Sequence, residues 1–163
     1  MKPMKPLVLA TVVAMVIVSL FTGGVQATTA GDDNDSLVVS IDSATYLDLD
    51  GDLAEDDILT VFTISVPHGD WVFQITYAYC RLVLPSGSYF ECTILIVGTY
   101  STITIGLGWY NTAVESGWYH FGLYAWANGP YAPGPGVCTT SFDPPTEGNP
   151  GPPVVEIVDV VYE

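Results

Sequence analysis

Between Trp71 and Val97 the chain reads WVFQITYAYCRLVLPSGSYFECTILIV, two runs of β-branched and aromatic residues separated by Pro85-Ser86-Gly87-Ser88. Such runs on either side of a short turn with Pro and Gly are typical of an antiparallel β-hairpin. A single register brings three favourable pairs of residues face to face across the two strands. These pairs are Cys80 with Cys92, Arg81 with Glu91, and Leu82 with Phe90.

The two faces of this hairpin differ in character because side chains alternate along a strand. Upstream, Trp71, Phe73 and Ile75 have the opposite parity to the apolar residues further along, which predicts a β-bulge near residues 76–78. We expect the apolar face after that bulge to lie on the core. Its members are Ala78, Cys80, Leu82, Phe90, Cys92 and Ile94.

From Leu37 onward the chain repeats this pattern of short strands and turn residues, with no helical period. Further strands are expected at residues 58–66, 101–107, 118–127, 137–142 and 154–162. The fold class is therefore predicted to be all-β, with about seven to nine antiparallel strands arranged as a sandwich of two sheets.

One later strand carries a more specific pattern, since residues 117–125 read GWYHFGLYA. This segment is similar to the G-x-Y-x-F/V-x-L-x-A strand of immunoglobulin-like surface modules, in which the tyrosine supports the corner before a late strand. The resemblance implies an immunoglobulin-like β-sandwich. A jelly roll or a small barrel is the alternative architecture for the same number of short strands.

Residues 1–27 have the pattern of a secretory signal peptide. Lys2 and Lys5 form a basic region, an apolar run extends from Leu7 to Phe21, and Val25-Gln26-Ala27 is a small-residue cleavage site. An uncleaved membrane anchor is the rival interpretation, but the apolar run has 15 residues, fewer than the roughly 20 that a spanning helix needs. We therefore expect a secreted or cell-surface protein with no membrane span after signal cleavage.

Behind the signal we expect an acidic flexible N-terminal tail at residues 28–36, a β-sandwich domain at 37–142, a Pro/Gly linker at 143–153 and a C-terminal strand at 154–163. The tail contains an N-glycosylation sequon that begins at Asn34. The C-terminal strand can fold back onto its own sheet or extend into the edge of a neighbouring molecule. We expect it to fold back, because a loose apolar strand promotes aggregation.

The charge of the chain is strongly one-sided, with 18 Asp and Glu residues against three Lys and Arg residues. Cleavage after Ala27 would leave Arg81 as the single basic side chain and a formal charge of −17. Such a surface repels nucleic acid and anionic membranes, so we expect neither as a partner. Ten of the acids lie within residues 32–57, and this uneven distribution favours a local site over a general adaptation to high salt.

The densest acidic segment is DLDGDLAEDD, at residues 48–57. Carboxylates fall at positions one, three, five and nine of a short loop, a spacing that lets the chain wrap a calcium ion with hard oxygen ligands. The predicted cofactor is therefore Ca²⁺. The candidate metal ligands are Asp48, Asp50, Asp52 and Asp56, with Asp57 or Glu55 completing the shell.

This segment resembles the D-x-D-x-D-G-x-x-D calcium loops of thrombospondin type 3, integrin-like and related extracellular repeats. The glycine departs from that pattern, since Gly51 stands at position four and Leu53 at position six. Leu59 occupies position twelve, where an EF-hand has a bidentate Glu, so a helix-loop-helix is not implied. The alternative is a solvated acidic turn, in which carboxylates about 5 Å apart repel by about 3 kcal/mol at an effective dielectric constant near 20.

The three cysteines predict one disulfide and one spare thiol in an exported chain. The hairpin register favours a bridge between Cys80 and Cys92, and a bridge from either residue to Cys138 is the alternative. No His or Asn arrangement supports a catalytic cysteine, and His68 and His120 lack metal-ligand spacing. The sequence holds no catalytic constellation, so we expect a protein that is not an enzyme.

Aromatic residues are frequent in the second half of the chain, where they can pack in the core or form a ligand-binding or partner-binding surface. Alternation along the expected strand at residues 118–127 puts Tyr119 and Phe121 on one face and Trp118, Tyr124 and Trp126 on the other, so one face is a candidate for exposure. The surface candidates are Trp109, Trp118, Tyr124 and Trp126.

Together these features predict a secreted or cell-surface, non-enzymatic calcium-binding β-sandwich module for adhesion or assembly, with cell-surface proteins or glycans as partners. Two alternatives remain open. One is a carbohydrate-binding module that uses exposed Trp and Tyr side chains. The other is a filament subunit that self-associates by exchanging its C-terminal strand.

Overall fold

A computed structural model describes residues 11–15, 35–69, 72–129, 132–144 and 151–163. Its strands are β1 (Thr11–Met15), β2 (Val38–Leu47), β3 (Asp57–Ser65), β4 (Val72–Val83), β5 (Tyr89–Tyr100), β6 (Thr102–Tyr110), β7 (Tyr119–Asn128), β8 (Gly136–Phe142) and β9 (Val154–Tyr162). A short 3₁₀ turn, η1 (Pro67–Gly69), follows β3. Within the described ranges, no helix has the length and apolar character needed to cross a membrane.

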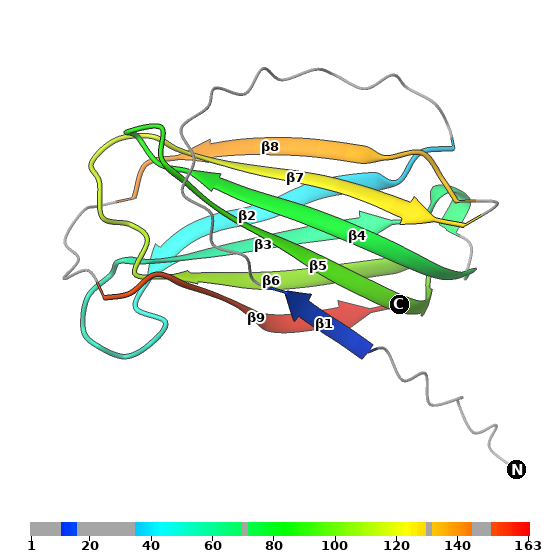
Figure 1. The fold of residues 1–163 in the computed structure, drawn as a ribbon, viewed down its shortest axis with the longest axis horizontal. Helices are drawn as coiled ribbons and strands as arrows, with labels where there is room; N and C mark the ends of the chain where they lie inside the picture. The colour runs from blue at the N-terminus through cyan, green and yellow to red at the C-terminus, as the bar shows by residue number, and fades with distance from the viewer. Residues whose placement is uncertain (1–10, 16–34, 70–71, 130–131, 145–150) are drawn as a thin grey trace, which may run out of the picture.

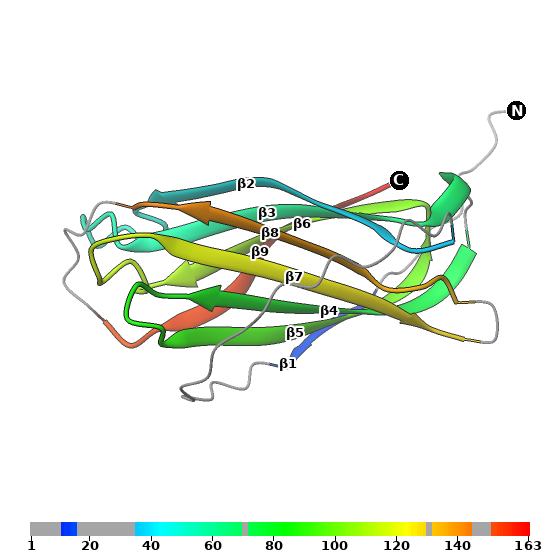
Figure 2. The ribbon, with the colours of Figure 1, turned by 90° about the horizontal axis from the view of Figure 1, so that it is seen from above.

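The strands form two antiparallel sheets that lie face to face (Figures 1 and 2). Sheet 1 has the order β1-β5-β4-β7-β8, and sheet 2 has the order β2-β3-β6-β9. The predicted strands are present with their ends within three residues of the expected positions. The prediction of an all-β sandwich is therefore confirmed.

The core lies between the two sheets and contains the inward-facing residue at every second position of a strand. On β7 these residues are Tyr119, Phe121 and Leu123, which are all buried. The Phe121 ring connects the two sheets, because its centroid lies 6.3 Å from that of Phe62 on β3 and 5.9 Å from that of Trp109 on β6. Aromatic pairs of this kind contribute about 0.5–1.5 kcal/mol beyond the burial of their area.

The β4–β5 hairpin has the predicted register along its whole length. On its outer face the Arg81 guanidinium lies 3.6 Å from the Glu91 carboxylate and 3.7 Å from the centroid of the Tyr89 ring. The one arginine of the chain is thus neutralised within its own hairpin. The predicted pairs are all present: Cys80 with Cys92, Arg81 with Glu91, and Leu82 with Phe90.

The bulge predicted near residues 76–78 is absent, because the ladder between the described residues of β4 and β5 has no shift. Phe73 is 68% exposed, and its neighbours Gln74 and Thr76 point into the core instead. The Tyr100 hydroxyl donates to Thr76 Oγ1 at 2.6 Å, which gives one of these buried polar groups a partner. An unbroken ladder of backbone hydrogen bonds therefore outweighs the hydrophobic alternation at this end of β4.

The three cysteines are free thiols in the structure. Cys80 and Cys92 are buried opposite each other on the inner face of sheet 1, and Cys138 is half-buried on β8. Burial raises the pKa of the Cys80 thiol well above 9.0 and that of Cys138 to about 11, so neither thiol ionises readily near neutral pH. The register behind the Cys80–Cys92 disulfide is confirmed, and the disulfide itself stays a prediction.

β1 belongs to the segment predicted to be a signal peptide, and in the structure it pairs antiparallel with residues 93–97 of β5. Residues 1–10 and 16–34 lie outside the described residues, and with them the predicted cleavage site and the Asn34 sequon.

The end of the predicted tail and the C-terminal strand are both part of the sandwich. The Gly134 amide donates to the Asp35 carbonyl, and the Leu37 amide donates to the Gly134 carbonyl, each at 2.9 Å. At the other end of the chain, β9 pairs antiparallel with β6. The C-terminal strand thus folds back onto its own sheet in this structure.

Trp109 is fully buried, so its prediction as a surface residue is wrong. Its indole N–H donates to Thr60 Oγ1 at 3.0 Å, and its ring packs against Phe121 in an edge-to-face arrangement. Because the indole N–H has a hydrogen-bond partner inside the core, it does not need to face water.

Replacing Trp109 by alanine should lower the free energy of unfolding by about 3–5 kcal/mol, because a large buried ring is lost and a cavity remains. The matched change at Trp118, which is 60% exposed, should alter it by no more than about 0.5 kcal/mol. Urea unfolding followed by circular dichroism measures both values. Equal effects of the two substitutions would contradict the placement of Trp109 in the core.

Candidate metal centre

The acidic loop, residues 48–56, connects β2 to β3 at one end of the sandwich (Figure 1). The residues that flank it, Leu47 and Asp57, face each other in the β2–β3 ladder. This pairing holds the two ends of the loop together. A run of carboxylates along the chain is thereby folded into a compact group.

Three carboxylates of the acidic loop converge. One oxygen from each of Asp48, Asp50 and Asp52 lies within 4.8 Å of the other two. Oxygens on opposite sides of a calcium ion, each about 2.4 Å from it, are about 4.8 Å apart. The three predicted ligands therefore lie at a spacing that one calcium ion can bridge.

The backbone of the loop turns toward these carboxylates. Successive N–H groups of residues 49–54 all donate to an aspartate carboxylate. Asp48 receives the N–H groups of Gly51, Asp52 and Leu53 at 2.7–3.1 Å. These dipoles offset part of the repulsion between the carboxylates and keep the loop tight.

The loop also adopts the left-handed backbone conformation that a glycine at position six would favour. Leu53 occupies that position with a φ of 75°, and Gly51 has a φ of 80°. A leucine in this conformation costs about 1–2 kcal/mol, and its side chain is 93% exposed, so core packing does not compensate. The hydrogen bond from the Leu53 amide to Asp48 is the contact that holds this conformation.

Asp57 anchors the loop through both of its carboxylate oxygens. It is buried at the start of β3, where Oδ2 accepts the Leu49 and Asp50 amides at 2.7 and 3.2 Å and Oδ1 accepts the Asn111 amide at 2.8 Å. Asp57, like the predicted ligands Asp56 and Glu55, is not among the three residues whose oxygens converge. Its role in these contacts is to fix the loop to the end of β6.

Asp56 is in the opposite situation. Its carboxylate is buried, and neither oxygen has a hydrogen-bond partner among the residues that the structure describes. Its carbonyl accepts the Thr112 and Ala113 amides at 2.9 and 2.8 Å. Burial raises the pKa of the Asp56 carboxyl above its ordinary 3.8, and the charges of Asp57 and Asp52 raise it further. A buried carboxylate without donors is costly unless a proton or a cation neutralises it.

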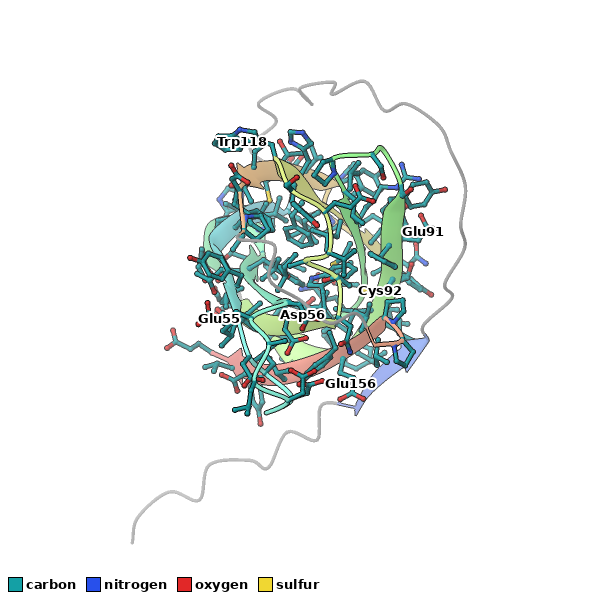
Figure 3. All side chains as sticks on the ribbon, turned by 90° about the vertical axis from the view of Figure 1, so that its left-hand side faces the viewer. Glu55, Asp56, Glu91, Cys92, Trp118 and Glu156 are labelled. Carbon is teal, nitrogen blue, oxygen red and sulfur yellow. The ribbon has the colours of Figure 1, made fainter. Side chains whose placement is uncertain are left out.

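Two glutamates lie near the loop in different ways. Glu55 is exposed, and in the end-on view of Figure 3 it lies toward the margin whereas Asp56 lies further inside. Glu156, on β9, was not predicted from the sequence. Burial raises the pKa of the Tyr110 hydroxyl, and the charges of Glu156, Asp57 and Asp50 raise it further, so β9 adds negative charge to the same end of the molecule.

Asn111 is a second residue that the sequence did not identify. It follows β6 with a φ of 55°, and its amide donates to Asp57. Its side chain accepts the Gly151 amide at 3.0 Å and donates to the Pro152 carbonyl at 3.4 Å. The only sequence signal was an asparagine directly after a strand, which is typical of a left-handed turn but does not reveal these partners.

Two of the remaining predicted surface aromatics, Tyr124 and Trp126, lie on the outer side of sheet 1. Tyr124 is 43% exposed on β7, and Trp126 stacks on Tyr77 of β4 with 5.1 Å between ring centroids and 10° between planes. The Tyr124 and Trp126 rings are 5.5 Å apart. The expectation that one face of this strand is exposed is confirmed.

No family model matches the chain, and neither the curated proteins nor the solved structures contain a match.

Changing Asp57 to asparagine should lower the free energy of unfolding by about 3 kcal/mol in a calcium-free buffer, because the amide group turns one acceptor into a donor that faces backbone N–H groups. Glu55→Gln, on an exposed neighbour, should change it by about 0.5 kcal/mol or less. Guanidinium unfolding in EGTA measures both. A small effect at Asp57 would show that its hydrogen bonds do not anchor the loop.

Proposed function

We propose that this chain is a secreted or cell-surface, non-enzymatic β-sandwich module, stabilised by Ca²⁺ in the acidic loop and used for adhesion or assembly. The observation that carries the proposal is the convergence of Asp48, Asp50 and Asp52. The buried carboxylate of Asp56 lies outside that group, has no hydrogen-bond partner among the described residues, and adds to the negative charge at this loop. An acidic turn in water does not need an additional buried carboxylate. A cation binding there would explain why its charge is tolerated.

Calcium fits the donors better than other common metals do. The converging side chains of Asp48, Asp50 and Asp52 offer carboxylate oxygens alone, and hard oxygen donors favour Ca²⁺ or Mg²⁺ over Zn²⁺. Mg²⁺ demands near-ideal octahedral geometry at shorter distances, whereas Ca²⁺ accepts six to eight oxygens in irregular loops. An affinity of about 10⁻⁴ to 10⁻³ M is sufficient for a module outside the cell.

The mechanism of such a module is structural. A divalent ion would neutralise the acidic loop and keep it closed, and the closed loop positions Asp57 against the Asn111 amide. Asn111 in turn holds the backbone of residues 151–152, directly before β9. Calcium binding would therefore stiffen three chain segments at one end of the sandwich, which suits a rigid module at a cell surface.

Calcium should raise the melting temperature of the chain. At a free concentration about 100 times the dissociation constant, binding to the folded state contributes about 2.7 kcal/mol, which corresponds to roughly 10 °C for a domain of this size. Differential scanning calorimetry in CaCl₂ and in EGTA, at matched ionic strength, measures the shift.

Matched variants identify the ligands. The double change Asp50→Asn with Asp52→Asn should abolish the calcium shift, whereas Asp42→Asn, on β2 outside the loop, should preserve it. Asp56→Asn should reduce the shift without lowering the melting temperature in EGTA, because a buried neutral amide costs less than an unpaired carboxylate. Equal midpoints of the unmodified chain in calcium and in EGTA would refute the calcium proposal.

A second candidate function is carbohydrate binding by the aromatic residues on the outer side of sheet 1. The observation in its favour is the group formed by Tyr77, Tyr124 and Trp126, whose rings lie 5.1–5.5 Å from their neighbours. Exposed ring faces provide apolar platforms with polar edges, which suits the alternating apolar and hydroxyl surfaces of sugar rings.

Affinity electrophoresis in gels that contain soluble polysaccharides tests this candidate. Retardation of the unmodified chain should disappear in Trp126→Ala and Tyr124→Ala and should persist in Phe73→Ala, an exposed aromatic residue at the far end of β4. Retardation that is equal in all variants, or absent throughout, would reject the aromatic group as the binding surface.

A further inference from the structure

The two sheets of the sandwich end in four edge strands, and an exposed edge strand can pair with another chain. Sheet 2 ends in β2 and β9, and sheet 1 ends in β8 and, beyond β5, in the short β1. β1 belongs to the predicted signal peptide. Once residues 1–27 are removed, as the proposed export requires, β5 becomes an edge of sheet 1.

Three of these edges carry features that discourage pairing with another chain. β2 has a shift in its ladder between Ile41 and Ser43 and carries Asp42, and β9 carries Glu156 and Asp159 together with a shift in its own ladder. β8 has only seven residues and begins beside Gly134, whose backbone is already paired. Charges, bulges and short length are the usual protections of sheet edges.

β5 has none of these protections along the part that β1 covers. Residues 92–100 read CTILIVGTY, without charge or proline, and the β4–β5 ladder shows no bulge. The one acid on β5, Glu91, is paired with Arg81 and accepts a hydrogen bond from the Tyr79 hydroxyl. The structure also shows that this edge accepts an apolar strand, because Thr11–Met15 pair with residues 93–97 (Figure 2).

We propose that in the mature chain the β5 edge pairs antiparallel with the β5 edge of a second copy, so that the two copies of sheet 1 form one continuous sheet. The inference rests on the removal of residues 1–27 and not on the calcium site. A two-fold contact centred on Leu95, the middle of the segment that β1 covers, places Leu95 opposite its own counterpart and Thr93 opposite Val97 of the second copy. These pairs are uncharged and β-branched or aliphatic, which suits a cross-strand contact.

A second copy fits this edge better than an acidic or basic partner does, since β5 offers no free charge to recognise either. The net negative charge of the chain opposes association at low salt. The acids Glu156 and Asp159 add to this repulsion, because β9 is the edge of sheet 2 on the same side as β5 (Figure 1). Screening by salt weakens that repulsion. Association through β5 should therefore strengthen as the salt concentration rises.

The side chain of Leu95 points to the outer face of sheet 1, where residues 91–99 alternate between half-buried and buried positions. Leu95→Lys therefore adds a charge without entering the core, and it places two ammonium groups opposite each other in the proposed pair. Leu95→Glu does the same with two carboxylates. Val161→Lys, on the exposed side of β9, is the matched control on the edge of the other sheet.

The test begins with the secreted chain, whose N-terminus is determined by mass spectrometry. Sedimentation equilibrium is then measured from micromolar to millimolar protein, in calcium and in EGTA. We expect a chain that starts near Thr28 and forms dimers. Leu95→Lys and Leu95→Glu should each be monomeric, with the melting temperature that the unmodified chain has at concentrations too low for dimers. A mixture of these two variants should dimerise, and Val161→Lys should dimerise like the unmodified chain.

A mature chain that stays monomeric at millimolar concentration would overturn the inference, as would association that Leu95→Lys leaves intact or that Val161→Lys abolishes. Retention of residues 1–27 would also overturn it, because β1 then fills the edge. Dimers that depend on Leu95 but appear equally in EGTA support the inference even if the calcium-dependent rise in melting temperature is not found. The two proposals therefore fail separately.

Discussion

The close packing of carboxylates at the turn between β2 and β3 is the constraint on which the rest of this structure depends. Pairing of the two strands forces the acids of residues 48–57 together, where like charges repel by several kcal/mol in total. Backbone N–H groups of residues 49–54 offset part of that repulsion. Among the described residues, no donor reaches the buried carboxylate of Asp56. This excess of negative charge is the physical basis of the proposed cation site.

The same turn organises the neighbouring chain segments. Asp57 accepts amides from its own loop and from Asn111, and Asn111 holds residues 151–152, so a single buried carboxylate links the β2–β3 connection to the end of β6 and the start of β9. The β5 edge of sheet 1 does not take part in these described hydrogen bonds of Asp57 and Asn111. There residues 92–100 of β5, which carry no charge, are stabilised by backbone pairing and by the core beneath them. This separates the proposed association from the proposed metal site.

The sequence predicted the fold class, the strands and the hairpin register because each depends on contacts that are local or that repeat with a simple period. At two residues, what the sequence does not reveal is a partner that is distant along the chain. Trp109 is in the core because Thr60 provides a hydrogen bond 49 residues away. Asp57 is occupied by the Asn111 amide 54 residues away. Residue type and spacing identified the acidic loop, but only the fold shows which carboxylates converge, which are occupied and which is left unpartnered.

The central claim is that a calcium ion lies among the carboxylates of the acidic loop. A crystal structure determined at high resolution from crystals grown in millimolar calcium tests it most directly. The account predicts one ion bound by oxygens of Asp48, Asp50 and Asp52 at about 2.3–2.6 Å, with six to eight ligands in total. A map that shows these carboxylates hydrated and pointing apart, with no ion between them, would contradict it.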